Sequence, residues 1–105
     1  MSDIDEDKYV MDADGSTRKP ASNEEWDAFY RTRKNRRIAL DEFDGVVVST
    51  VFLGYDHSFE GPPLLFETMI FGSEYDQEQW RYATKTEAFE GHAKAVNLVK
   101  QCQLK

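Results

Sequence analysis

Apolar and polar residues alternate along the middle of the chain with a period of two, which is typical of β-strands. Ile38 and Leu40 share one face of the first such segment. The segment 46–53 is β-branched and apolar on both faces, which predicts a strand at the centre of a sheet. We expect a second long strand over 63–72 and a short last strand over 79–83.

Two segments change to the helical period, and each begins with a capping signal. Ser22 followed three residues later by Glu25 is a capping box, and it predicts a helix that runs to about Lys34. Its apolar stripe consists of aromatic side chains that we assign to the core: Trp26, Phe29 and Tyr30.

The second helix is predicted to follow Thr84, because Glu87 completes another capping box. Its inward face is expected to carry mostly small residues, which allow close packing on a sheet: Ala88, Gly91, Ala95, Leu98 and Cys102.

The first eight residues are mostly charged, and the first predicted strand follows them. Residues 1–8 are expected to form a mobile acidic leader, and residues 9–11 a short strand. Asp14-Gly15 then predicts a tight turn. A calcium loop built on Asp12, Asp14 and Ser16 is disfavoured, because the glycine comes too early for that ligand spacing.

These elements predict one α+β domain over residues 9–105, with a small antiparallel sheet of four to five strands and two helices packed on one face. No stretch of the 105 residues is apolar enough to cross a bilayer, and no signal peptide precedes the domain. A single cysteine excludes an internal disulfide. We therefore expect a cytoplasmic protein without a membrane anchor.

The net charge of −7 is unevenly distributed. Residues 1–17 carry −5, residues 18–37 carry +4 and the remainder carries −6. The overall sign makes direct binding to nucleic acid unfavourable, because such binding needs a basic face. One basic cluster remains as a candidate contact for phosphate or for an acidic partner, against the alternative that cations stabilise a helix end; it comprises Arg31, Arg33, Lys34, Arg36 and Arg37.

The segment VSTVFLGYDH, with PPLLFETMIFG, RYAT and Gly91-His92 further on, resembles a family of small, functionally uncharacterised proteins of tailed bacteriophages and prophages. The resemblance covers roughly the last 60 residues. It implies a role in the cytoplasm of an infected bacterium and supplies no mechanism.

The candidate site residues gather around the long loop between the two longest strands. Tyr55 and Phe59 lie in this loop, which glycine and proline bound, and they are either exposed for recognition or folded back onto the sheet. A small-ligand site, for a nucleotide or a metal, would draw on imidazole, carboxylate and guanidinium groups; its candidate members are Asp56, His57, Glu67, Arg81 and His92. The alternative is that Asp56 and His57 bond to the loop backbone while His92 packs under the sheet.

No catalytic or cofactor motif occurs, and the spacing of the two histidines matches no metal signature. We therefore expect no cofactor, no resident metal and no catalysis. The leading hypothesis is a phage accessory protein that binds a host or phage protein and modulates or inhibits it. The alternatives are the small-ligand site and an acidic DNA mimic; a homodimer through an exposed edge strand, at 9–11 or 79–83, also stays open.

Overall fold

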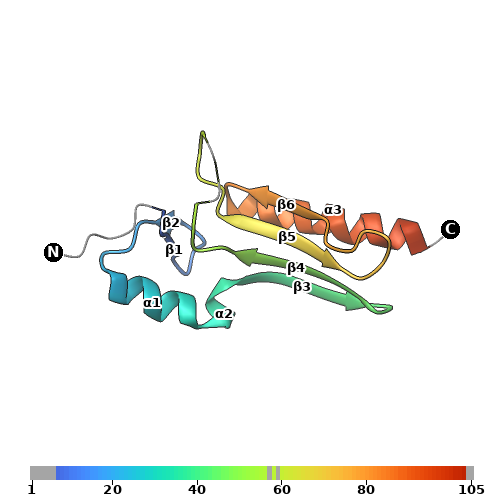
Figure 1. The fold of residues 1–105 in the computed structure, drawn as a ribbon, viewed down its shortest axis with the longest axis horizontal. Helices are drawn as coiled ribbons and strands as arrows, with labels where there is room; N and C mark the ends of the chain where they lie inside the picture. The colour runs from blue at the N-terminus through green and yellow to red at the C-terminus, as the bar shows by residue number, and fades with distance from the viewer. Residues whose placement is uncertain (1–6, 57, 59, 104–105) are drawn as a thin grey trace.

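The computed structural model describes residues 7–56, 58 and 60–103, and it has the α+β fold that the sequence predicts. The predicted leader, 1–8, lies outside the described residues except for Asp7 and Lys8. A four-stranded antiparallel sheet forms the body of the molecule, and a long helix lies along one of its faces (Figure 1).

The large sheet is a simple meander in which each strand pairs with the next one in sequence. Its strands, in spatial order, are β3 (Arg37–Phe43), β4 (Val46–Phe52), β5 (Phe66–Phe71) and β6 (Gln79–Tyr82). The central position predicted for the β-branched segment is confirmed, since β4 has a strand on either side.

The remaining described elements are a small hairpin and three helices. They are β1 (Val10–Met11), β2 (Thr17–Arg18), α1 (Asn23–Arg31), α2 (Arg33–Arg36) and α3 (Lys85–Gln103). No helix of the described residues is both long and apolar enough to cross a membrane.

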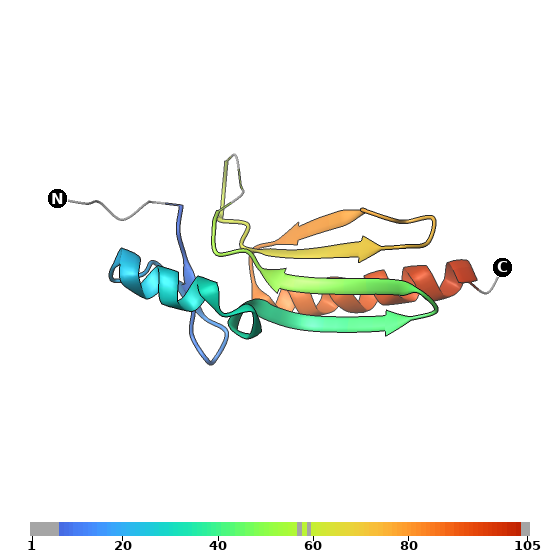
Figure 2. The ribbon, with the colours of Figure 1, turned by 60° about the horizontal axis from the view of Figure 1, so that its bottom comes forward.

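Helix α3 covers one face of the sheet and contacts all four strands (Figure 2). The core beneath it is filled by alternate residues of β4 and β5, among them Val48, Phe52, Phe66 and Ile70, which are fully buried. The helix contributes Ala88 and Ala95, as predicted, together with His92 and Val99, which the small-residue pattern did not include.

Helix α1 lies beside the small hairpin at one end of the sheet (Figure 1). Its Phe29 packs edge-on against Phe52, with 5.6 Å between the ring centroids. The predicted single helix to Lys34 is instead two, because Thr32 is extended (φ −93°, ψ 106°) and ends α1.

The predicted capping bonds to the hydroxyls of Ser22 and Thr84 are present, but the Glu25 carboxylate does not bond back to the Ser22 amide as a capping box requires. The Glu25 amide donates to Ser22 Oγ (3.1 Å), and the Glu87 amide donates to Thr84 Oγ1 (3.1 Å). The Glu25 carboxylate, however, accepts from the Ala21 amide (2.6 Å) and from Arg18. These two contacts lower the pKa of Glu25 to about 2, the Arg18 guanidinium having the larger effect.

The first long strand contains an irregularity that the alternation did not predict. The register with β4 shifts between Arg37 and Ala39. As a result Ile38 packs with the core cluster around Phe52, whereas Leu40 pairs with Ser49 on the opposite face and is 37% exposed. The prediction that Ile38 and Leu40 share a face is therefore wrong, and a local β-bulge is the reason.

Candidate functional site

The loop between β4 and β5 is organised by Asp56. Its carboxylate accepts hydrogen bonds from the Ser58 amide (2.8 Å), the Ser58 hydroxyl (2.7 Å) and the Leu64 amide (3.1 Å). Its own amide donates to the Asp7 carbonyl (2.8 Å). For Asp56, these bonds match the alternative in which its side chain stabilises the loop backbone. His57 and Phe59 lie outside the described residues.

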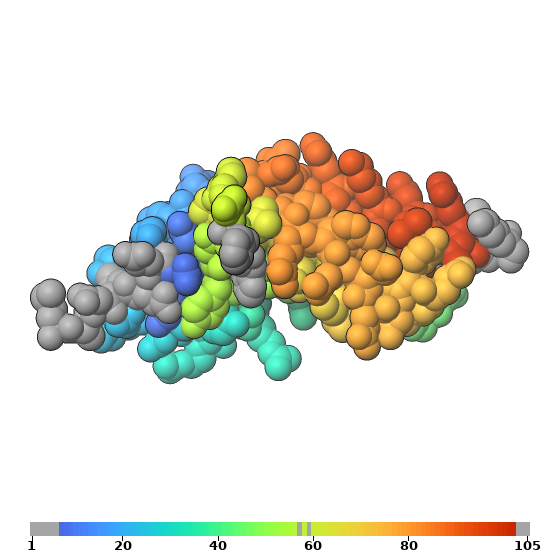
Figure 3. All heavy atoms as spheres, turned by 45° about the horizontal axis from the view of Figure 1, so that its top comes forward, coloured from blue at the N-terminus to red at the C-terminus, as the bar shows by residue number. Residues whose placement is uncertain are grey.

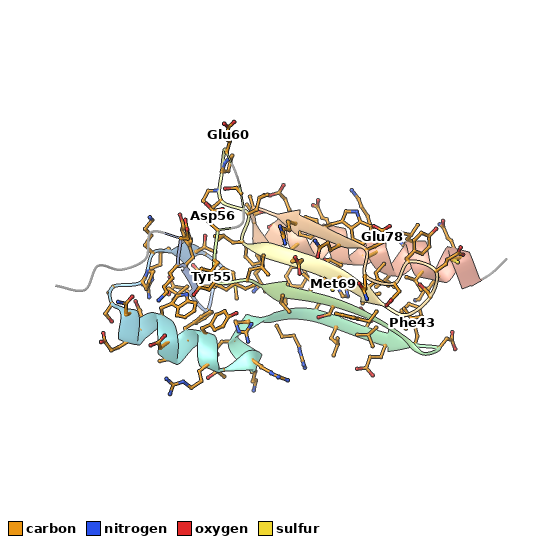
Figure 4. All side chains as sticks on the ribbon, viewed as in Figure 1. Phe43, Tyr55, Asp56, Glu60, Met69 and Glu78 are labelled. Carbon is orange, nitrogen blue, oxygen red and sulfur yellow. The ribbon has the colours of Figure 1, made fainter. Side chains whose placement is uncertain are left out.

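Tyr55 is folded back into an aromatic cluster with helix α1. Its ring, labelled in Figure 4, lies edge-on to Trp26 (centroids 5.0 Å apart) and to Tyr30 (6.2 Å). The Trp26 and Tyr30 rings stack on each other at 4.5 Å. The Trp26 indole donates to the Gly54 carbonyl (3.1 Å). The cluster thus ties the beginning of the loop to α1, which matches the folded-back alternative for Tyr55.

Glu67 and Arg81 form an ion pair between β5 and β6. Arg81 Nε donates to Glu67 Oε2 at 3.0 Å, and the two residues are direct cross-strand partners. Glu67 alternates with Phe66 and Thr68, which face α3, so the pair lies on the opposite face of the sheet. This face, which α3 does not cover, is hereafter the open face.

His92 lies on the covered side, so the structure does not bring it together with Glu67 and Arg81. It forms a buried polar network with two strands. Nδ1 is 2.7 Å from Thr50 Oγ1, which is 2.5 Å from Thr68 Oγ1, and Nε2 is 2.6 Å from Asp41 Oδ2. His92 is 6% exposed, and both threonines are fully buried.

A hydroxyl, an imidazole and a carboxylate in series are the components of a nucleophilic relay. Here the hydroxyl of Thr50 has no solvent-accessible surface and is already bonded to Thr68, so a substrate has no access to it. Only Asp41, whose side chain is 53% exposed, reaches solvent. The network satisfies polar groups inside the core and positions α3 on β3 and β4.

Three of the five members of the basic cluster come together at one hollow on the open face. Arg36 is tied to α1, since its Nε donates to the Tyr30 carbonyl (2.9 Å) and its guanidinium lies 4.1 Å from the Tyr30 ring centroid. With Arg33 and Arg37 it borders this hollow, next to Ser49 and Val51. Arg31 and Lys34 are also exposed, on α1 and α2 respectively.

A groove that the sequence did not predict runs between β6 and α3 (Figure 3). It encloses about 470 Å³. Trp80 and Tyr82 line it from the strand, and the remaining lining comes from the helix: Glu87, Glu90, Gly91, Lys94, Ala95 and Leu98. Trp80 is 36% exposed there, which is unusual for so large an apolar side chain.

Gly91 allows β6 and α3 to lie close together at this groove. A methyl group at Gly91 would overlap the Tyr82 phenol, so the ring lies directly across the glycine. The small-residue pattern of the helix did predict a close approach to the sheet. The exposure of the Trp80 indole beside Gly91 could not be predicted, because it depends on the position of β6.

The described residues contain no group of three or more histidine, cysteine, aspartate or glutamate side chains that could hold a metal ion. The candidates for a single small-ligand site lie apart: Asp56 in the loop, Glu67 and Arg81 on the open face, and His92 beneath the sheet. Chemically, the arrangement offers surfaces for binding.

Comparison with known proteins finds no match: no family model, no curated protein and no solved structure is similar to this chain at the significance required. The resemblance to phage proteins therefore stays a prediction.

Proposed function

We propose that the protein acts without catalysis, by binding an extended segment of another protein in the groove between β6 and α3. The observation that carries the proposal is the exposed indole of Trp80 at a groove beside a strand with a free edge. Tryptophan and tyrosine dominate the binding energy of protein interfaces. In line with the phage resemblance, the proposed partner is a host or phage protein.

The main chain of β6 supports this mode of binding. Within the described part of the chain, β6 pairs only with β5. The Ile70 amide donates to the Glu78 carbonyl just before β6. Thr68 and Trp80 are the next hydrogen-bonded pair in the same ladder. In an antiparallel ladder such pairs alternate, so the main-chain groups of Gln79 and Arg81 point away from β5. They are free to pair with an added strand.

The side chains around the groove indicate what such a segment would carry. Ala95 and Leu98 give the groove an apolar floor that suits one large apolar side chain. Glu87 and Glu90 line it with Lys94, which leaves one net negative charge among the lining residues. A segment with an apolar anchor and a basic residue beside it fits this lining best.

The test is affinity capture from bacterial lysate with the immobilised full chain, compared across three variants. Trp80→Ala removes the anchor, and Gln79→Pro removes one outward N–H at a strand position where proline is tolerated. Phe89→Ala is the matched control, because Phe89 is an exposed aromatic (49%) that does not line the groove.

We expect wild type and Phe89→Ala to retain the same bound protein, and both groove variants to lose it while remaining folded by circular dichroism. A protein captured equally by all four baits would contradict the proposal, and so would the absence of any stoichiometric partner.

A further inference from the structure

The open face of the four-stranded sheet has an apolar centre. Antiparallel pairing places outward-facing residues in rows across the strands, with Ser49 paired to Leu40 on one side and to Met69 on the other. The apolar members of these rows are Leu40, Val47, Val51, Met69 and Phe71. Phe71 is 45% exposed and Leu40 is 37% exposed, and no described element covers this face. Figure 4 shows it with Met69 near its middle.

The two ends of the open face carry opposite charge. Arg33 and Arg37 lie at the end where β3 begins, beside Val51. Glu42 lies toward the other end, where it pairs with Val47. Glu78 lies near this same acidic end, because its carbonyl accepts from the Ile70 amide and it directly precedes β6 (Figure 4).

We infer that a second copy of this chain covers the open face, so that two sheets stack into a symmetric sandwich. A two-fold axis in the plane of the face and perpendicular to the strands reverses the strand direction. It places β3 over β3 of the partner and the basic end of one copy over the acidic end of the other. Each interaction then occurs twice, which is the property of an isologous interface.

The register of this arrangement follows from the strand itself. The axis is placed at the row of Leu40, Ser49 and Met69, so that Leu40 lies over Leu40 of the second copy. Arg37 is opposite Val51 and Glu42 is opposite Val47, each two residues along β4 from Ser49, because the β-bulge absorbs one residue of β3. Arg37 therefore meets Glu42 of the second copy. Val47 meets Val51 in the same way, and in β5 Phe71 meets Glu67, whose charge is already paired with Arg81.

The size of the face sets the expected strength. The four strands have seven, seven, six and four residues. At about 3.3 Å per residue and about 4.8 Å between strands, they cover roughly 380 Å² per copy, or about 760 Å² in total. This lies below the usual range of stable specific interfaces, so the dimer is expected to dissociate on dilution. Its charged ends are exposed to solvent, so salt should weaken it further.

The experiment is sedimentation equilibrium of the full chain over a range of concentrations, with circular dichroism to confirm that each variant is folded. Leu40→Lys should yield a monomer at every concentration, because Leu40 is exposed and lies on the axis, so that two lysines would meet. Arg37→Glu and Glu42→Arg should each raise the dimer dissociation constant about tenfold, corresponding to roughly 1.4 kcal/mol. The double variant Arg37→Glu/Glu42→Arg should restore it, because both swapped charges meet in the dimer. Arg31→Glu, an exposed charge on α1, is the control and should have no effect.

Several results would overturn this inference. A wild-type chain that is monomeric at all concentrations would do so, as would a double variant that remains as weak as the single ones. A dimer that is lost in Gln79→Pro but unaffected by Leu40→Lys would show pairing through the β6 edge instead. None of these outcomes depends on whether the groove binds another protein, because the groove lies on the opposite side of β6.

Discussion

His92 Nε2 and Asp41 Oδ2 lie 2.6 Å apart, although 51 positions separate the two residues in the chain. The contact joins the middle of α3 to β3, an edge strand of the sheet. On its other side the same imidazole bonds to Thr50 in the central strand. One side chain therefore holds the helix to two strands through directional bonds, in addition to the apolar contacts of the core.

This relationship predicts that His92→Ala destabilises the fold by about 2–3 kcal/mol, since it leaves a cavity and removes a bonding partner from a buried hydroxyl. Urea unfolding followed by circular dichroism measures the change. Asp41→Ala should cost less, because the carboxylate it removes is half exposed. An Asp41→Ala variant that is destabilised more than His92→Ala would contradict this account of the network.

The two threonines give a second, independent prediction. Thr50→Val leaves His92 Nδ1 and Thr68 Oγ1 without their buried partner, which should cost about 1–3 kcal/mol. Thr68→Val has the smaller effect, because Thr50 keeps its bond to His92. A double-mutant cycle in urea should show the two changes to be non-additive. Strictly additive costs would mean that the hydroxyls are not coupled.

The elements whose residues agree with their local environment could be predicted from the sequence. The strand Val46–Phe52 consists mostly of β-branched residues and is central, and the capping hydroxyls of Ser22 and Thr84 are where the pattern placed them. In these places local preference and tertiary packing favour the same conformation.

Other features depend on contacts that no local pattern contains. Thr32 ends α1 without glycine or proline, and the bulge at Arg37–Ala39 reverses the face of every later residue in that strand. That reversal turns Asp41 toward His92 and Leu40 toward the open face. The alternation of apolar and polar residues cannot reveal the bulge, because a bulged strand has the same kinds of residues as a regular one.

The candidate site shows the same division. The structural alternatives for Asp56 and Tyr55 could be stated from the loop sequence alone. The groove could not, because it requires the position of β6 relative to α3. Its one local signal is the pair of Trp80 on a short strand and Gly91 on the following helix, and this pair acquires a meaning only once the two elements are packed together.

Gly91→Ala should destabilise the protein, although alanine normally favours a helix interior by about 1 kcal/mol. The added methyl group would overlap the Tyr82 phenol, and relieving the overlap should cost about 1–3 kcal/mol. The control is Ala93→Gly at an exposed site of the same helix, where the usual propensity should apply. A more stable Gly91→Ala variant would show that Tyr82 can move aside without loss.

The two tryptophans should respond to the same substitution to different degrees. Trp26 is 7% exposed, stacks on Tyr30 and donates to the Gly54 carbonyl, so Trp26→Phe should cost about 1–3 kcal/mol. Trp80→Phe should change the free energy of unfolding by less than about 0.5 kcal/mol, since Trp80 lies at the surface. Urea unfolding of both variants tests this, and equal losses would contradict the placement of Trp80.

The ion pair between Arg18 and Glu25 predicts a pH dependence of stability. Arg18 Nη2 lies 2.7 Å from Glu25 Oε2, and with the Ala21 amide it lowers the pKa of Glu25 from 4.5 to about 2. Because the folded state has the lower pKa, the ionised carboxylate stabilises the fold at pH values above about 4.5. That contribution is lost progressively as the pH falls toward 2.

Glu25→Gln should therefore melt at a lower temperature than wild type at pH 7, and the difference should shrink between pH 4.5 and pH 2. Glu24→Gln is the matched control, because Glu24 lies in the same first helical turn and the interaction with the helix dipole is common to both. Thermal unfolding at a series of pH values distinguishes the two effects. A difference that stays constant down to pH 2 would show that the Glu25 pKa is not lowered by folding, and a Glu24→Gln profile identical to that of Glu25→Gln would assign the effect to the helix dipole.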